Sequence, residues 1–209
     1  MKISELAPLV LIDSKNVKRN LTDLFDNQIE NQTTNKSMQE VTDPLMDQTK
    51  DLKDHKPTKE IKKDIHDKAW NAKEGSYTQY YGSDSLDASV LLMEQYGFIE
   101  AKDERFVKTV HAIERELSYE GLLFRYKNKD DFGAPTSSFT ICTFWFINSL
   151  YKIGEVEKSK KLFDQVLSYS NHLGLFSEDL DFKTKRLLGN FPQAYSHLAL
   201  IDAALNFNE

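Results

Sequence analysis

Residues 138–151 decide the fold, and they read SFTICTFWFINSLY. Wound into a helix, this stretch presents apolar side chains on more than one face, and such a helix is normally buried. Gly154 breaks the pattern and sets the C-terminal end of the helix. Phe144 and Trp145 could form a sugar-stacking platform, but their place in the most apolar helix favours core packing. We therefore expect this helix to be buried.

Apolar patterns on both sides of this stretch predict further helices. Residues 103–117 carry a stripe at helical spacing, formed by Phe106, Val110, Ile113 and Leu117. Residues 156–170 are also amphipathic, and shorter helices are expected over 58–70 and 86–95. Pro192 suits the first turn of a last helix, whose stripe holds Ala194, Leu198, Ile201 and Leu205. The sequence thus predicts an all-α fold of about six helices with long connecting loops, the last of them over 171–191.

The two ends of the chain differ in composition. Residues 13–67 contain one Phe, no Tyr or Trp, and many Asn, Gln, Asp and Lys. A segment of this kind buries too little apolar surface to offset the entropy of ordering it. We therefore expect a disordered N-terminal tail of low hydrophobicity over 1–57 and a folded domain over 58–209.

Charge and cysteine content exclude several classes of function. The net charge is −6 and the basic residues form no stripe, so no nucleic-acid partner is expected. Cys142 is the one cysteine, which rules out an internal disulfide and argues against a metal site of the cysteine type. No apolar run reaches the length of a membrane span and no signal peptide is evident, so we expect a cytoplasmic protein without a membrane partner. No cofactor is indicated.

One long loop combines carboxylates with glycines and aromatic residues. Residues 173–181 read LGLFSEDLD, and residues 188–197 read LGNFPQAYSH. Glu178, Asp179 and Asp181 lie within four residues of one another. Taken alone, such a cluster is typical of a solvated loop, and a catalytic carboxylate is the alternative.

These motifs, in this order, resemble the end of the catalytic domain in family 15 glycoside hydrolases, the glucoamylase and trehalase-like enzymes. The resemblance covers about 145 residues. It also includes residues 79–89, which read QYYGSDSLDAS, the stretches 97–98, 103–106 and 125–126, and the apolar run 139–145. It implies that 58–209 is the C-terminal part of such a domain, with the fold of a partial (α/α)6 toroid. The implied substrates are α-linked glucosides, either maltooligosaccharides or trehalose.

The resemblance also implies roles for individual residues. Glu178 matches the general base, which takes a proton from the water that attacks the anomeric carbon in an exo-acting, inverting hydrolase. Asp179 and Asp181 are expected to order the loop or face solvent. His197 is expected to pack against the helix rather than transfer protons.

Four further residues are candidates for substrate binding, and each has a structural alternative. Arg125 matches an arginine near the sugar, but it could also be ion-paired at the surface. Tyr126 follows it in the same motif. Tyr195 matches an aromatic position near the base, with core packing as the alternative. Asp87 caps its helix or reaches a sugar hydroxyl, and capping is favoured.

The general acid of the family lies in an upstream Trp-Glu motif, and neither Trp70 nor Trp145 is followed by Glu. We therefore expect an incomplete site and exposed apolar surface on the inner helices, with association as a homo-oligomer or with a complementing N-terminal half. Three functions stay open: an α-glucoside hydrolase, a non-catalytic carbohydrate-binding or partner-dependent remnant, and a plain helical scaffold. No metal ligand set is readable.

Overall fold

The computed structural model of the chain describes residues 59–131 and 133–207, so the predicted tail over 1–57 lies outside the described residues. Six α-helices are present in the described part, as expected. They are α4 (Lys59–Lys68), α5 (Leu92–Gln95), α6 (Glu104–Leu117), α7 (Thr140–Ile153), α8 (Val156–Leu167) and α9 (Ala194–Leu205), and a 3-10 turn, η2 (Ala88–Leu91), leads into α5. Among the described residues, no helix is both long and apolar enough to cross a membrane.

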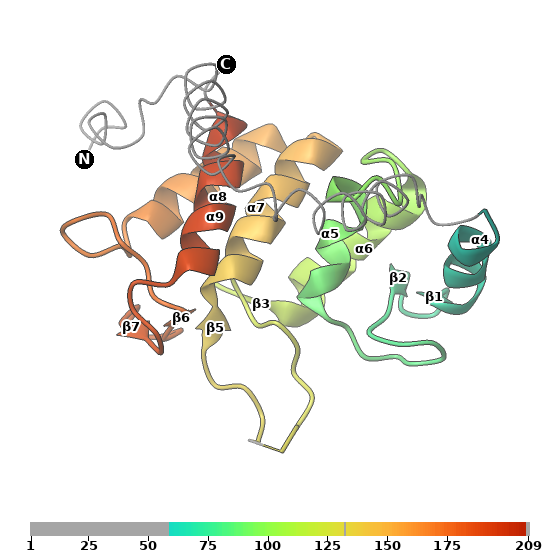
Figure 1. Ribbon diagram of the computed structural model, residues 1–209, viewed down its shortest axis with the longest axis horizontal. Helices are drawn as coiled ribbons and strands as arrows, with labels where there is room; N and C mark the ends of the chain where they lie inside the picture. Colours follow the sequence, from blue (N-terminus) through green and yellow to red (C-terminus); the bar gives the residue numbers. More distant parts are fainter. Residues whose placement is uncertain (1–58, 132, 208–209) are drawn as a thin grey trace, which may run out of the picture. The chain divides into compact units, whose positions relative to one another are not determined.

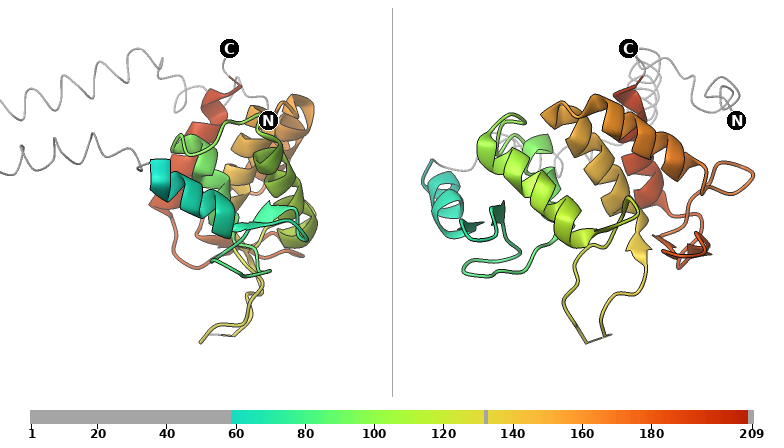
Figure 2. Two further views of the ribbon diagram at one scale, coloured as in Figure 1. Left: turned by 90° about the vertical axis from the view of Figure 1, so that its right-hand side faces the viewer. Right: turned by 180° about the vertical axis from the view of Figure 1, so that it is seen from behind.

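Helix α7 lies at the centre of the folded part. It packs against α9, α8, η2 and α6. Figure 1 shows α5, α7 and α9 in front, and Figure 2 shows α6 and α8 on the opposite side. The helices behind α7 are amphipathic, since α6 buries Phe106, Val110 and Ile113 and α8 buries Leu162, Phe163 and Val166. The apolar helices α7 and α9 therefore lie in one layer, and the amphipathic helices α6 and α8 lie in the other.

The prediction that this helix is buried is confirmed. Phe144 is fully buried, and its ring meets those of Phe163 and Phe176 edge to face, at centroid distances of 6.4 and 5.4 Å. Trp145 is only half-buried and packs at the margin of the core. Gly154 ends α7 in the left-handed conformation, with a φ of 94°, so that its N–H closes the last turn.

The expectation of an all-α fold needs one correction, because three short antiparallel sheets occur among the described residues. Strand β1 (Trp70–Asn71) pairs with β2 (Ser76–Tyr77), and β3 (Ser118–Tyr119) pairs with β4 (Leu122–Leu123). The third sheet joins β5 (Ser138–Phe139), β6 (Asp179–Leu180) and β7 (Leu187–Leu188). Strands of two residues leave no alternating pattern in the sequence, which is why they were not predicted.

The start of the last helix also differs from the prediction. Pro192 follows a cis peptide bond and precedes the helix instead of occupying its first turn. Gln193 keeps an extended backbone, with φ −101° and ψ 117°, and its N–H donates to the carbonyl of Phe176 at 3.0 Å. This bond ties Gln193 to the loop before β6, so α9 begins only at Ala194.

Candidate functional site

Glu178 lies immediately before β6, where the loop after α8 meets the N-terminal end of α7. Its carbonyl accepts the N–H of Thr140, the first residue of α7, at 2.9 Å. Its own N–H donates to the carbonyl of Asn190 at 2.9 Å. The backbone of Glu178 is therefore fixed between the central helix and the loop that leads to α9.

Only one oxygen of the Glu178 carboxylate accepts hydrogen bonds from the described residues. Oε2 accepts the backbone N–H of Asn190 at 3.2 Å and its side-chain amide at 3.0 Å. Among the described residues, Oε1 has no hydrogen-bond donor. Glu178 is partly exposed to solvent.

Gly189 makes this contact sterically possible. A Cβ at this position would lie 2.8 Å from Oε2 of Glu178 and 3.1 Å from its Cβ. The φ of Gly189 is 73°, a left-handed conformation that also favours glycine. The contact of Asn190 with Glu178 was missed in the sequence, although the Gly-Asn pair after an apolar run signals a tight turn there.

The two neighbouring aspartates have different environments. Asp179 accepts a hydrogen bond from the hydroxyl of Ser137 at 2.7 Å. Burial raises the pKa of Asp179, the charge of Glu178 acts in the same direction, and the Ser137 bond opposes both. Asp181 accepts the N–H and the hydroxyl of Thr184 at 2.6 and 2.7 Å, and these bonds lower its pKa. Asp181 therefore orders the turn between β6 and β7.

Asp87 and Arg125 form a pair beside η2. Asp87 is buried, and its Oδ1 accepts the N–H of Ser89 at 2.8 Å, which is the capping geometry that was favoured from the sequence. Its Oδ2 lies 3.4 Å from Nε of Arg125. The N–H of Ala88 donates to the carbonyl of Arg125 at 2.8 Å. Half of the Arg125 side chain is exposed.

The two candidate tyrosines lie near the surface. Tyr126 donates its hydroxyl to Asp130 at 2.7 Å, and this bond raises the pKa of Tyr126. Tyr195 is 62% exposed in the first turn of α9, so the alternative of core packing is wrong. The hydroxyl of the next residue, Ser196, donates to the carbonyl of Ser177 at 2.9 Å. This bond brings the start of α9 next to Glu178, the residue that follows Ser177.

His197 has a fixed tautomer. Its Nε2 lies 3.2 Å from the backbone nitrogen of Phe176, which can only donate. Its Nδ1 lies 2.7 Å from the carbonyl of Gln193, which can only accept. The proton is therefore on Nδ1, and both ring nitrogens are used in holding the start of α9 to the loop. This packing role is the one expected from the sequence.

These groups gather around the N-terminal end of α7. Thr140 bonds to Glu178, and Thr143 accepts the N–H of Leu123, two residues before Arg125. Burial raises the pKa of Cys142 in the same turn, and the charges of Asp87, Arg125 and Asp179 also act on this thiol. Within the described residues, no hydrogen bond or ion pair links Glu178 directly to the Asp87–Arg125 pair or to the two tyrosines.

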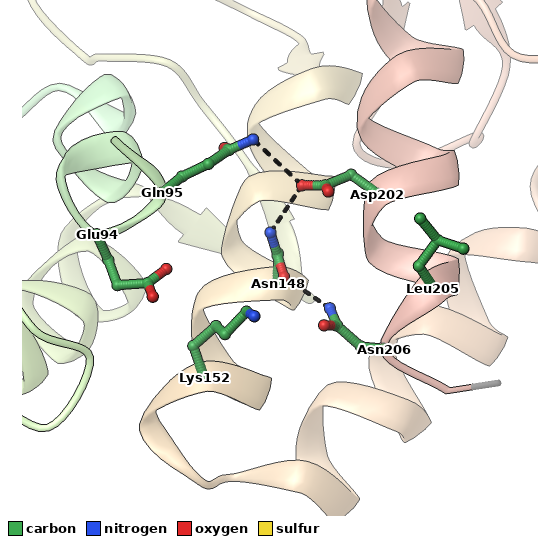
Figure 3. Close-up of a pocket in the computed structure, with 7 residues that line it drawn as sticks. All are labelled: Glu94, Gln95, Asn148, Lys152, Asp202, Leu205 and Asn206. Atoms are coloured by element: carbon green, nitrogen blue, oxygen red, sulfur yellow. Dashed lines mark hydrogen bonds between the residues drawn. The ribbon is translucent and has the colours of Figure 1, made fainter. Parts of the chain in front are cut away.

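A separate polar hollow of about 300 Å³ lies between α5, α7 and α9 (Figure 3). It is lined by Glu94, Gln95, Asn148, Lys152, Asp202, Leu205 and Asn206. None of the site residues predicted from the sequence lines it. The hollow is therefore a second feature of the surface and not part of the site around Glu178.

The fold is similar to part of a solved glycosidase. A solved glycosidase in complex with glucose superposes with a TM-score of 0.60 at 13% identity, and the match covers 70% of this chain and 42% of that one. The trehalase of Thermoplasma volcanium is 42% identical over 151 residues, which are 72% of this chain and 24% of the trehalase. The trehalase of Mycolicibacterium smegmatis is 43% identical over 150 residues, 70% of this chain and 22% of its own length.

The family model described as "Glycosyl hydrolases family 15" matches residues 28–162 and 153–205. The chain therefore belongs to glycosyl hydrolases family 15. It spans about a quarter of the length of the curated trehalases that it matches.

Proposed function

We propose that this chain carries the general base of an exo-acting, inverting α-glucoside hydrolase, with Glu178 as the base. The supporting observation is the asymmetric environment of its carboxylate. Both donors of Asn190 point at Oε2, so this oxygen stays an acceptor, while Oε1 has no donor among the described residues. Oε1 is then the atom that takes the proton of the attacking water.

The general acid is proposed to come from the part of the family 15 domain that has no counterpart here. In an inverting pair the second carboxyl group lies roughly 6.5–9.5 Å from the base, which leaves room for the water. Asp179 is a poor substitute, because it pairs in β6 and is engaged by Ser137. On this proposal the six helices form part of an (α/α)6 toroid, with Glu178 on its catalytic face.

Arg125 is proposed to bind the sugar, and Asp87 to position it. Nε of Arg125 faces the buried Asp87 carboxylate at 3.4 Å, which leaves the outer nitrogens for neighbouring hydroxyls. Tyr126 and Tyr195 then border the cleft, since one follows Arg125 and the other lies in the first turn of α9, whose Ser196 is bonded to Ser177 beside Glu178. Trehalose is favoured over maltooligosaccharides because the relatives that are 42–43% identical are named trehalases.

Glucose release from trehalose, maltose and maltotriose tests this proposal. The chain is assayed alone and with the part of the Thermoplasma volcanium trehalase that precedes its match. We expect the mixture to release glucose, and Glu178→Gln to reduce the rate by a factor of about 10² or more. Glu157→Gln on the exposed start of α8 is the matched control and should change nothing.

An inactive mixture in which the two polypeptides are bound to each other would contradict the catalytic proposal. It would favour the alternative, a non-catalytic carbohydrate-binding or partner-dependent remnant. A rise in melting temperature with trehalose, seen equally in wild type and Glu178→Gln, would then identify carbohydrate binding without hydrolysis.

A further inference from the structure

Helix α4 contacts β2 and the segment before α6 through the ring of one histidine. The ring of His66 packs at a tilt on that of Phe98, with a centroid distance of 4.7 Å, and lies 5.8 Å from the ring of Tyr77. Nδ1 of His66 is also hydrogen-bonded to the hydroxyl of Tyr77. Figure 1 shows α4 next to the hairpin of β1 and β2. No residue of α4 itself is buried, so the contacts of this one ring matter for its attachment.

The hydroxyl of Tyr77 depends on His66 for an acceptor. Tyr77 is only 1% exposed, and among the described residues its hydroxyl has no hydrogen-bond partner other than Nδ1 of His66. Burial raises the pKa of Tyr77 to about 12, so the hydroxyl keeps its proton at neutral pH. The O–H group therefore donates to Nδ1, which is possible only while this nitrogen carries no proton.

Four charged groups act on His66, two from α4 and two from the start of α6: Lys62, Asp67, Asp103 and Arg105. Burial is the largest influence and lowers the pKa of His66, the two cations act in the same direction, and the two carboxylates oppose them. The guanidinium carbon of Arg105 lies 6.0 Å from the ring centre of Tyr77, and Nζ of Lys62 lies 5.5 Å from that of Phe98. A positive charge on the imidazole would therefore add to two cations that already flank the same aromatic cluster.

We propose that His66 is a pH-sensitive switch, which holds α4 against β2 while its imidazole is neutral and releases the helix when it is protonated. Protonation places a proton on Nδ1, and the buried hydroxyl of Tyr77 then loses its acceptor, which destabilises the attached state. Because the pKa of His66 is lowered in the folded chain, its contribution to attachment is fully present above 6.5 and is lost as the pH falls through the folded pKa.

The bonds at the C-terminal end of α4 do not involve the histidine. The carbonyl of Ala69 accepts the N–H and the hydroxyl of Thr78 at 3.0 and 3.1 Å. The ring of Trp70 meets that of Tyr77 edge to face at 5.3 Å. These contacts remain when His66 is protonated, so α4 moves about a hinge at Ala69 and Trp70 while the β1–β2 hairpin stays in place.

Hydrogen exchange of the full chain, followed by mass spectrometry between pH 5 and pH 8, tests the proposal and does not depend on glucose release. The rates are corrected for the pH dependence of exchange in unstructured peptides. Relative to the amides of α6, we expect those of α4 to exchange faster at pH 5 than at pH 8 by a factor of about three or more. An NMR titration of the His66 imidazole should have the same midpoint as this change in exchange.

His66→Gln separates the proton from the contact, because the amide oxygen of glutamine can accept the Tyr77 hydroxyl but does not titrate in this range. We expect α4 of this variant to exchange slowly at both ends of the range. His172→Gln is the matched control at an exposed position in the loop after α8, and it should keep the wild-type response. Tyr77→Phe removes the hydroxyl that loses its acceptor, so it should reduce the response.

Three results would overturn the proposal. They are a wild-type chain in which the exchange of α4 relative to α6 does not change with pH, equal responses in wild type and His66→Gln, and loss of the response in His172→Gln. Circular dichroism at pH 8 shows whether the variants are folded. If His66→Gln does not fold, Tyr77→Phe decides, and a response as large as that of wild type overturns the proposal.

Discussion

Helices α7 and α9 lie side by side and have similar apolar compositions, but they differ in what covers them. Eight residues of α7 are buried, from Thr140 to Leu150 on several faces. In α9 only Ser196, Ala199 and Ala203 are buried. Its remaining large apolar side chains are exposed, namely Tyr195, Leu198, Ile201 and Leu205. An apolar sequence on all faces of a helix therefore does not by itself show that every face is buried. Other elements of the chain bury α7 on several faces, whereas they bury α9 on one.

Phe144→Ala should give the largest effect, because it removes a ring from the covered helix. Phe144 is fully buried between Phe163 and Phe176. Truncation of such a residue costs about 3–5 kcal/mol of the free energy of unfolding. Urea unfolding followed by circular dichroism measures it. Phe191→Ala is the matched control at a phenylalanine that is 47% exposed before α9, and equal losses for the two variants would remove the distinction between the helices.

Asp179→Asn tests whether the carboxylate of Asp179, near the start of α7, is buried enough to destabilise the folded state when it is charged. Burial raises the pKa of Asp179 above its ordinary 3.8, so the folded chain binds this proton more tightly than the unfolded chain. The stability that Asp179 provides is therefore present below 3.8 and is lost as the pH rises through the folded pKa. We expect Asp179→Asn to be more stable than wild type at pH 7, by less than about 1 kcal/mol, with no difference near pH 3.

Asp181→Asn is the control, because the pKa of Asp181 is shifted in the opposite direction to that of Asp179. The bonds from Thr184 lower the pKa of Asp181, so its contribution is present above 3.8 and is lost as the pH falls through the folded pKa. Thermal unfolding between pH 3 and pH 7 measures both variants. Parallel curves for the two would contradict the assigned environments.

Leu198→Ala should have the smallest effect on the isolated chain. Leu198 is 64% exposed, and alanine is at least as good a helix former, so the free energy of unfolding should change by less than about 0.5 kcal/mol. The same urea experiment measures it. A decrease of about 2 kcal/mol or more in the free energy of unfolding, as expected for a buried leucine, would show that Leu198 is buried in solution. Helices α7 and α9 would then not differ in burial.

The helical part of the fold was readable from the sequence because its signals are local. The stripe of Phe106, Val110 and Ile113 and the apolar run around Phe144 are periodic within one element, and the structure confirms both. The three short sheets were not predictable, because each strand has two residues and β5 pairs with β6 across a long stretch of chain.

In the candidate site, too, the features set by local sequence were predictable, and those set by contacts between distant residues were not. The backbone position of Glu178 follows from a motif that is continuous in sequence, whereas the bonds from Asn190 depend on a turn at Gly189 that brings residues twelve apart into contact. The pairing of Asp87 with Arg125 joins two distant loops. Neither the exposure of Tyr195 nor that of Leu198 could be read from residue type, since exposure depends on which other elements pack against α9.

Cys142 allows opening of the core to be measured by chemical labelling. It is the one cysteine in the sequence, it is fully buried in the first turns of α7, and burial raises its pKa. A maleimide reagent can reach this sulfur only when the centre of the molecule opens. The labelling rate of the unmodified protein therefore reports how often the centre of α7, next to the candidate site, opens in the native state without denaturant.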